Sequence, residues 1–423
     1  MEEWKEYRLG DFMEFNPTVK LPKNTMARKV TMDQLVPHCR DIYNWTYEPY
    51  SGGAKFQNGD TIMARITPCL ENGKHAFVSF LDDDEIAYGS TEYIVIRGRK
   101  GISDNLFVYY LSHYPEFKNT AVKSMVGSSG RQRAQVDVLE NIMMFLPSLP
   151  VQYGIANFLS SLDDKIEVNR RLNDNLEQQA QALFKSWFVD FEPFKDGEFV
   201  ESEMGMIPKG WRVGVYDDII LETISGDWGK EKAEGNYTHK VACIRGCDFQ
   251  DIKNGLRGKT PERFILEKNY QNKHFCDKDM LVEISGGTAT VSTGRVCPVS
   301  QQLINKYNGD VVCTNFCRLV RPKKGYGAYL YYSWFNKYNN KVMFGYENGT
   351  SGIKNFRIKD FTSIEPVVLP PLEKIQEFQN VIDSIQKQIQ TRGTESQNLA
   401  QLRDTLLPRL MSGELKVNEI EMH

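Results

Sequence analysis

Long apolar segments are lacking from this chain of 423 residues. No run of about 18 apolar residues is present, which predicts that no segment crosses a membrane. The first residues, Met1-Glu2-Glu3-Trp4-Lys5, provide neither the charged region nor the apolar core of a secretory signal. We therefore expect a cytoplasmic protein with no membrane partner.

Cysteine and histidine are scarce, with eight and six residues respectively. Eight cysteines are too few for a disulfide scaffold in a chain of this length. The closest pairs, Cys243/Cys247 and Cys313/Cys317, have C-x3-C spacing and no neighbouring histidine. We expect buried thiols there, and no metal site, because the histidines also lack metal-binding spacings.

Motifs for catalysis are missing as well. There is no Walker A sequence, and Ser285-Gly286-Gly287-Thr288 is only an isolated glycine-rich turn. Adenine methyltransferases use a short Asn/Asp-Pro-Pro-aromatic motif, and the nearest string, Asn16-Pro17-Thr18-Val19, lacks its second proline and its ring. No pair of carboxylates can be nominated from spacing alone. The sequence therefore predicts a chain that is not itself an enzyme and that holds no cofactor.

The composition that is present is that of an ordinary globular protein, with 41% hydrophobic and 25% charged residues. Its length suggests two to four domains. The net charge of -3 and the pI of 6.2 argue against a nucleic-acid binder that is basic all over. Local basic patches remain compatible with these values.

The chain repeats itself. Gly127-Ser128-Ser129-Gly130 and Gly349-Thr350-Ser351-Gly352 are each followed by a basic stretch and then by a hydrophobic stretch ending in Leu-Pro. A nearly constant offset also relates Thr91-Glu92-Tyr93 to Thr314-Asn315-Phe316. Because the same offset persists through about 35 residues of matched apolar positions, we predict two copies of one domain, each followed by a helix.

Each copy ends in a segment whose apolar residues follow the 4-3 spacing of a coiled-coil seam. The predicted seam residues are Ile155, Leu159, Leu162, Ile166, Leu176 and Leu183 in the first copy and Phe378, Ile382, Ile385, Ile389, Leu399 and Leu406 in the second. Both seams have polar centres, Asn169 and Asn173 in one and Arg392 and Ser396 in the other. We expect two helices of about 30 residues that pack on each other, with the polar centres meeting. Packing of each helix on its own domain is the alternative.

The globular parts are predicted to be mixed. Strand-like runs occur at 93–96, 316–320 and 363–369, and helical candidates at 105–112 and 328–334. We predict an α+β fold in which two similar globular domains are separated by two long helices that pair as an antiparallel coiled coil with pseudo-two-fold symmetry. The predicted parts are the first domain at 1–150, the first helix at 151–188, a linker at 189–209, the second domain at 210–370, and the second helix with a C-terminal tail at 371–415.

Two similar domains joined by a rod suit a ligand with two matching sites, and DNA half-sites about one helical turn apart are such a ligand. Basic side chains beside flexible glycine turns can contact phosphates, while polar loops can read bases. The candidate base-reading loops are 43–65 in the first copy and 245–259 and 285–295 in the second. The candidate DNA-binding residues are Ser51, Lys55, Gln57, Arg65, Lys74, Lys123, Arg131 and Arg133 in the first copy and Arg245, Lys253, Arg257, Thr288, Arg295, Lys354 and Arg357 in the second. Each basic cluster could equally be a solvated loop, and the aromatic string at 43–47 could pack on its own sheet.

Four groups of residues carry a resemblance to a known family. They are the Leu-Pro-rich segments at 146–150 and 369–372, Leu183-Phe184-Lys185-Ser186-Trp187-Phe188-Val189-Asp190-Phe191-Glu192-Pro193, Met204-Gly205-Met206-Ile207-Pro208-Lys209-Gly210-Trp211, and Leu407-Pro408-Arg409-Leu410-Met411-Ser412-Gly413-Glu414-Leu415. Each is modest alone, but in this order they make the chain resemble, over its whole length, the specificity subunit of type I DNA restriction-modification systems.

The resemblance implies that each globular copy is a target recognition domain that reads one half of a split sequence in double-stranded DNA. It implies that the paired helices set the spacing, and that the chain recruits two modification (methyltransferase) subunits and two restriction subunits. S-adenosylmethionine would then belong to the modification subunits, and ATP and Mg2+ to the restriction subunits. The acidic pI departs from the expectation for a DNA binder and suggests that partners supply phosphate contacts.

Two other classes of function stay open on the sequence alone. One is a non-enzymatic scaffold whose tandem modules bind protein or carbohydrate. The other is a self-contained DNA methyltransferase or nuclease.

Overall fold

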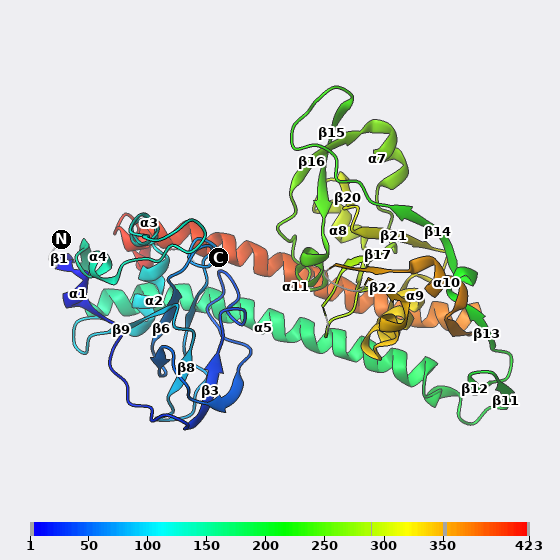
Figure 1. Cartoon of the computed structure of the whole chain (residues 1–423), viewed down its shortest axis with the longest axis horizontal. Helices are drawn as coiled ribbons and strands as arrows, with labels where there is room; N and C mark the ends of the chain where they lie inside the picture. The colour runs from blue at the N-terminus through cyan, green and yellow to red at the C-terminus, as the bar shows by residue number, and fades with distance from the viewer. Residues whose placement is uncertain (1–3, 289, 350–352, 421–423) are drawn as a thin grey trace. The chain divides into compact units, whose positions relative to one another are not determined.

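The computed structural model describes residues 4–288, 290–349 and 353–420. The chain forms two units, which we call unit 1 (Met1–Glu167 with Asn398–His423) and unit 2 (Val168–Gln397). Each unit therefore contains one globular domain and a part of each long helix (Figure 1). Among the helices of the described residues, none combines the length and the apolar character needed to cross a membrane.

Unit 1 is built on two four-stranded sheets. The strands of the first are, in spatial order, β2 (Met13–Phe15), β9 (Tyr93–Gly98), β6 (Thr61–Ala64) and β7 (His75–Phe77). Those of the second are β4 (Thr46–Pro49), β3 (Met26–Val30), β8 (Ala87–Gly89) and β5 (Lys55–Phe56), and β3 runs parallel to β8. A separate pair joins β1 (Trp4–Arg8) to β10 (Met143–Pro147), so the two ends of the first domain lie side by side.

Unit 2 repeats this plan. Its four-stranded sheet has the order β14 (Ile220–Ser225), β21 (Cys317–Pro322), β17 (Met280–Glu283) and β19 (Val296–Pro298). Its three-stranded sheet has the order β16 (Glu262–Leu266), β15 (Tyr237–Ile244) and β20 (Val311–Cys313), with β15 parallel to β20. The remaining sheets are β13 (Arg212–Val215) with β24 (Pro366–Leu369), β11 (Phe199–Ser202) with β12 (Gly205–Pro208), and β18 (Ser285–Gly286) with β23 (Lys354–Phe356) and β22 (Glu347–Asn348).

The two domains share more than strand order. In unit 1, Arg97 on β9 donates from Nε and Nη2 to Asp60, at 2.6 and 2.8 Å. In unit 2, Arg321 on β21 donates to Asp279 through the same two nitrogens, both at 3.0 Å. Both carboxylates are almost fully buried. The predicted duplication is therefore confirmed in topology and in a matched internal ion pair.

Short helices cover the sheets. They are α1 (Leu9–Phe12), α2 (Asn105–His113), α3 (Pro115–Lys123) and α4 (Val136–Glu140) in unit 1, and α6 (Phe249–Lys253), α7 (Glu267–Lys273), α8 (Gln301–Asn305), α9 (Gly327–Asn339) and α10 (Ile358–Ile364) in unit 2. The helices predicted at 105–112 and 328–334 are confirmed as α2 and α9. Asp104 caps α2 by accepting a hydrogen bond from the N–H of Phe107 at 2.8 Å.

One predicted strand is partly wrong. The run 363–369 was expected to be extended throughout, but Ser363 and Ile364 end helix α10 and the strand β24 begins only at Pro366. Proline cannot continue the helix, so the chain changes conformation at this residue. The predicted linker at 189–209 contains the hairpin formed by β11 and β12.

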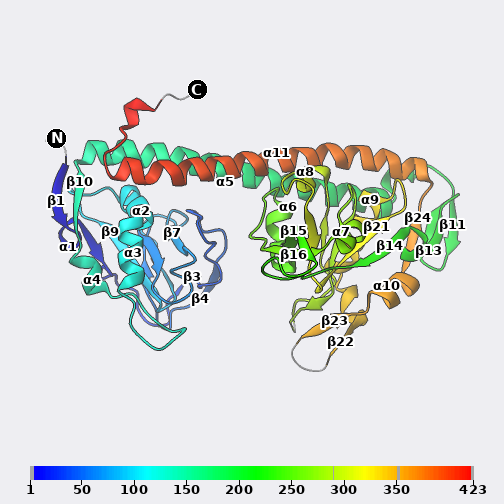
Figure 2. The same ribbon diagram turned by 90° about the horizontal axis from the view of Figure 1, so that it is seen from above.

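The two long helices are α5 (Leu149–Phe188) and α11 (Leu372–Met411), of 40 residues each. They are longer than the predicted 30 residues, and apolar residues at their ends, such as Phe188 and Met411, are buried in the hydrophobic cores. Within unit 2, Asn169 donates to Ser396 at 3.3 Å and Asn173 donates to the carbonyl of Ile389 at 3.2 Å, so the helices run antiparallel (Figure 2). The predicted meeting of the polar centres is confirmed by the first of these contacts.

The predicted seam matches the buried face of α11 more closely than that of α5. On α11 the seam residues Phe378, Ile382, Ile385, Ile389 and Leu406 are buried and Leu399 is half-buried. On α5, Ile155 and Leu159 are buried, whereas Leu162, Ile166, Leu176 and Leu183 are half-buried. The reason is that α5 also packs on the globular part of its unit, as when Phe184 contacts the rings of Tyr329 and Tyr332.

These observations confirm the predicted α+β class with two similar domains and paired long helices. The pseudo-two-fold relation between the domains stays a prediction.

Candidate nucleic-acid interface

The glycine-rich turn of unit 1 projects from a tight backbone frame. Val126 and Arg133 pair across its base, with N···O distances of 3.1 and 2.9 Å. Gly127 and Gly130 have φ values of 139° and 77°, which side chains rarely tolerate. All residues of the tip are exposed. A rigid base with a glycine tip lets a phosphate approach the backbone closely.

Two of the predicted cations beside this turn are exposed and form no ion pair in the described part of the chain. Lys123 ends α3 and Arg131 follows the turn, and both side chains are exposed. Neither meets an acid within ion-pair distance in the described part of the chain. These two residues are suited to contact phosphates, which carry most of the affinity of proteins for DNA.

Arg133, the third predicted cation of this turn, is engaged. It donates to both carboxylate oxygens of Glu92, at distances between 2.6 and 3.0 Å. This hydrogen bond raises the pKa of Arg133 above its ordinary value. Arg133 therefore holds the turn against the strand that begins at Tyr93, and its charge is compensated inside the protein.

The next three predicted residues of unit 1 differ in exposure and in the bonds that they form within the domain. Ser51 is exposed, and Lys55 lies 5.8 Å from the centre of the Tyr50 ring. The backbone N–H of Gln57 donates to Asp60, so this residue helps to form the turn before β6. Ser51 and Lys55 remain available to a ligand.

Two further cations of unit 1 bond to the backbone of their own domain. Lys74 donates to the carbonyl of Met32 at 2.5 Å, and Arg65 donates from Nη2 to the carbonyl of Ala134 at 3.3 Å. Both are half-buried. Their positions favour a structural role. In the aromatic string at 43–47, Trp45 stacks on Phe80 with ring centres 4.8 Å apart, whereas Tyr47 is 63% exposed.

In unit 2 four predicted cations form ion pairs with acids of the same domain. The pairs are Arg245 with Asp248 at 3.0 Å, Arg295 with Glu283 at 2.7 Å, Lys354 with Glu347 at 2.8 Å and Arg357 with Asp360 at 2.7 Å. The charges of these four predicted cations are therefore compensated within the domain.

The last three predicted DNA-binding residues of unit 2 have different surroundings. Lys253 lies over the ring of Phe335 at 4.6 Å, and burial lowers its pKa. Arg257 is exposed and lies over Tyr307 at 4.9 Å. Thr288 is exposed in a turn in which its Oγ1 accepts a hydrogen bond from the N–H of Val291 at 3.0 Å. Thr350, Ser351 and Gly352 of the second glycine-rich turn lie outside the described residues.

A recess that the sequence analysis did not assemble lies at one edge of unit 2. It has a volume of about 490 Å³ and brings Arg245 and Ser285, from two predicted loops, beside Trp228, Asn315 and Phe316. The candidate loops at 245–259 and 285–295 are far apart in the sequence, so only the sheet topology could place them together.

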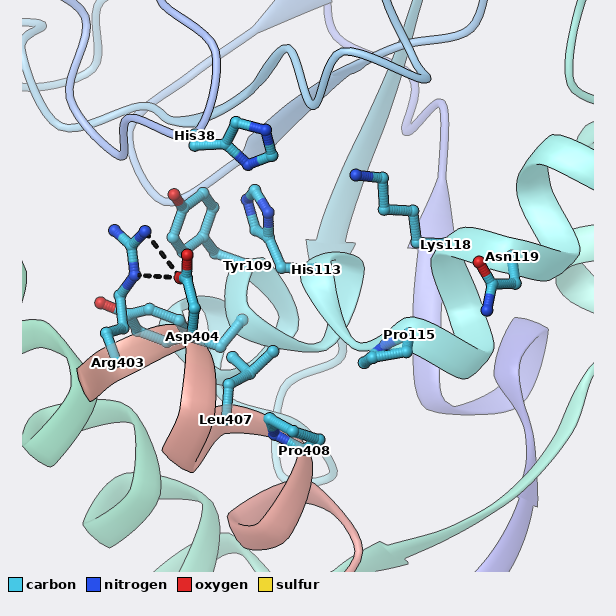
Figure 3. Close-up of a pocket in the computed structure, with 11 residues that line it drawn as sticks. His38, Tyr109, His113, Pro115, Lys118, Asn119, Arg403, Asp404, Leu407 and Pro408 are labelled. Carbon is cyan, nitrogen blue, oxygen red and sulfur yellow. Dashed lines mark hydrogen bonds and ion pairs between the residues drawn. The ribbon is translucent and has the colours of Figure 1, made fainter. Parts of the chain in front are cut away.

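A second pocket, of about 290 Å³, belongs to unit 1. In it the rings of His38, Tyr109 and His113 face Lys118 across the space beside α11 (Figure 3). Burial lowers the pKa of His113 well below its ordinary value. Nowhere in the described ranges do His, Cys, Asp and Glu side chains form a group that could hold a metal ion.

Comparison with known proteins shows what this chain is similar to. The family model of the type I restriction modification DNA specificity domain matches residues 1–178. The type I restriction enzyme HindI specificity subunit of Haemophilus influenzae is 25% identical, over 98% of this chain and 100% of its own length. The MjaIX specificity subunit of Methanocaldococcus jannaschii is 27% identical, over 74% of this chain and 70% of its own. Residues 1–178 therefore match a type I DNA specificity domain, and nearly the whole chain is similar to specificity subunits of type I restriction-modification systems.

Solved structures of type I specificity subunits also align along nearly the whole chain. The HsdS subunit from Thermoanaerobacter tengcongensis is 18% identical, with a TM-score of 0.36 over 98% of this chain and 97% of its own. The S subunit from M. genitalium is 13% identical, with a TM-score of 0.49 over 96% of each chain.

These similarities confirm the resemblance seen in the sequence. They also confirm a targeting subunit rather than an enzyme, since the relatives are specificity subunits. The individual DNA-binding residues stay predictions.

Proposed function

We propose that this chain reads a bipartite DNA sequence, with each of its two globular domains contacting one half-site. The observation that carries the proposal is the duplicated domain, in which the four-stranded sheets β2-β9-β6-β7 of unit 1 and β14-β21-β17-β19 of unit 2 have the same strand order. Two copies of one reading module suit two half-sites, and symmetric or duplicated DNA-binding proteins use this arrangement. The similarity to type I specificity subunits supports DNA as the ligand.

Phosphate contacts would position the protein and base contacts would specify the sequence. In unit 1, Lys123 and Arg131 supply open charge beside an exposed glycine turn. In unit 2, most predicted cations are paired with acids, so fewer charges are available. With a net charge of -3, the chain alone is expected to bind DNA weakly.

Partner subunits would supply the remaining phosphate contacts and the chemistry. We propose a complex in the cytoplasm with two modification subunits, which bind S-adenosylmethionine and methylate adenine, and two restriction subunits, which use ATP and Mg2+. The modification subunits would flip the target adenine out of the duplex, because chemistry on a base requires access to it. The paired helices would set the spacing between the half-sites.

Domain exchange tests this proposal. Residues 1–150 are replaced by those of a relative with a different specificity, and methylated adenines are mapped across the genome. We expect one half of the recognised sequence to change and the other half to stay the same. A change in both halves, or in neither, would contradict modular reading. A scaffold that binds protein or carbohydrate would direct no methylation at all.

A further inference from the structure

The recess of unit 2 is built where several strands end together. β15 and β20 run parallel and pair Ile244 with Cys313, so the segments that follow them emerge at the same edge. β17 pairs antiparallel with β21 and places Glu283 opposite Cys317. The connections after β15, β17 and β20 therefore converge, and they supply Arg245, Ser285 and the turn Asn315–Phe316.

The backbone of this turn is fixed, while its side chains are open. The N–H of Phe316 donates to Thr314 Oγ1 at 3.2 Å, and the carbonyl of Phe316 accepts from the N–H of Ile284 at 2.9 Å. Thr314 is buried and donates its own N–H to the carbonyl of Ile244 at 3.0 Å. Asn315 is exposed, and Phe316 is 62% exposed. Because the backbone of the turn is already fixed, a ligand that binds here has to order only these two side chains.

The duplicated domain provides an internal comparison. At the matching positions of unit 1, Glu92 forms the ion pair with Arg133, and Tyr93 is only 3% exposed. There the same turn closes on its own domain. In unit 2 the turn instead presents an amide and an apolar ring to solvent, so the two copies differ where a reading element would be expected to vary.

The chemistry of Asn315 and Phe316 matches one kind of base pair. An asparagine amide can bond to both N6 and N7 of adenine in the major groove, and an apolar ring can contact the 5-methyl group of thymine. An A·T pair presents both features. An arginine without an acidic partner would favour guanine instead. At this edge, however, the guanidinium groups of Arg245 and Arg295 form ion pairs with Asp248 and Glu283, which leaves Asn315 and Phe316 as groups that can read a base.

We infer that Asn315 and Phe316 are specificity-determining residues that read an A·T base pair in the half-site contacted by unit 2. This inference rests on the proposed function, because it assumes that the domain faces DNA. It assigns the amide of Asn315 to adenine and the ring of Phe316 to the thymine methyl group.

The first experiment maps methylated sequences in cells that carry the complex with the wild-type chain, Asn315→Ala or Phe316→Ala. A good base contact contributes about 1–3 kcal/mol of discrimination, which corresponds to a preference of roughly 5- to 150-fold. Each variant is expected to lose a preference of this size at one A·T position of the second half-site. The first half-site is expected to stay unchanged.

The second experiment uses the purified complex and synthetic duplexes of the mapped site. Uracil replaces each thymine in turn, which deletes only the methyl group, and 7-deazaadenine replaces each adenine except the methylated one, which deletes only N7. The wild-type complex is expected to respond to both substitutions at one base pair. Phe316→Ala should be insensitive to uracil there, and Asn315→Ala should be insensitive to 7-deazaadenine.

Matched controls lie at the other ends of the same strands. Leu221 is 64% exposed on β14, at the end that pairs toward Pro322 and away from Phe316. Asn236 is exposed just before β15, whereas the recess lies after that strand. Leu221→Ala and Asn236→Ala are expected to leave the half-site unchanged.

The outcomes distinguish a failure of the proposed function from a failure of the assignment of Asn315 and Phe316. If the wild-type complex methylates no bipartite sequence, the proposed function fails. If it does so and the recess variants keep full discrimination at every position, only the assignment of Asn315 and Phe316 is overturned. The same holds if the controls alter the half-site as strongly as the recess variants do.

Discussion

At the scale of single residues, the charge that a side chain offers to DNA depends on partners that lie far away in the sequence. Arg133 and Arg131 look equivalent beside the glycine turn, yet only Arg133 meets Glu92, which lies 41 positions before it. The residue types of the candidate interface could be predicted from composition and repeats. Which of them remain open could not, because pairing is decided by the register of strands that the sequence does not reveal.

Two histidines packed against each other give unit 1 a sensitivity to acid. His75 is buried and His113 is half-buried, with ring centres 4.7 Å apart, and burial lowers the pKa of His75 to about 3 and that of His113 well below its ordinary value. In the unfolded chain a histidine titrates near pH 6.5. Between these values the unfolded state binds more protons than the folded state. Stability is therefore full above about pH 6.5 and falls as the pH drops, by up to about 1.4 kcal/mol per pH unit for each histidine.

His113→Phe tests this effect, because it keeps an aromatic ring and removes one titrating group. The difference in free energy of unfolding between variant and wild type, measured by urea denaturation of the full chain, is expected to shift in favour of the variant as the pH falls from 6.5 to 4. His239→Gln is the control with the opposite sign, because Glu267 and Asp310 together outweigh burial and raise the pKa of His239. A pH-independent difference for His113→Phe would contradict the prediction.

At the scale of elements, sequence periodicity predicts the features that depend only on residues close together in the chain, such as the buried face of a helix. The seam of α11 was predicted residue by residue, because its 4-3 pattern is set by helix geometry. The recess of unit 2 could not be predicted in this way, since it requires β15 and β20 to lie side by side after 66 intervening residues. Contacts between a loop and a helix are equally invisible in the sequence.

The contact between Gly393 and Gly255 is such a case. Gly393 lies in the middle of α11, and a Cβ atom placed on it would come within 2.3 Å of the backbone of Gly255. Glycine to alanine inside a helix normally stabilises by about 1 kcal/mol. Here the loop would have to move, so Gly393→Ala is expected to lower the free energy of unfolding of unit 2.

Gly154→Ala is the matched control in α5. Its nearest neighbour is the Val417 side chain, at 4.0 Å from a Cβ atom placed on Gly154, so the new methyl group has room. This substitution is expected to stabilise by about 0.5–1 kcal/mol. Urea denaturation of both variants checks the opposite signs. Stabilisation by Gly393→Ala would show that the loop does not rest on the helix.

At the scale of the whole molecule, the proposed function assigns the long helices the role of a spacer. Each helix is continuous through a boundary between units, at Glu167 and Val168 in α5 and at Gln397 and Asn398 in α11. A heptad inserted at both boundaries leaves the internal contacts of each unit intact and keeps the seam nearly in register, because two turns of helix take up about seven residues.

Such a double insertion is expected to lengthen the DNA spacer that the complex tolerates. Seven residues at 1.5 Å each add about 10 Å, which corresponds to about three base pairs at 3.4 Å per pair. Mapping methylated adenines in cells that carry the variant complex measures the new spacer. An insertion in α5 alone makes α5 seven residues longer than α11 between the units, so the helix pairs of unit 1 (Asp163 with Arg403) and of unit 2 (Asn169 with Ser396) cannot both keep their register. That variant is therefore expected to lose stability and to direct no ordered methylation. A doubly extended chain that still methylates sites with the original spacer would remove the helices from the reading of distance, while leaving the reading of each half-site to the two domains.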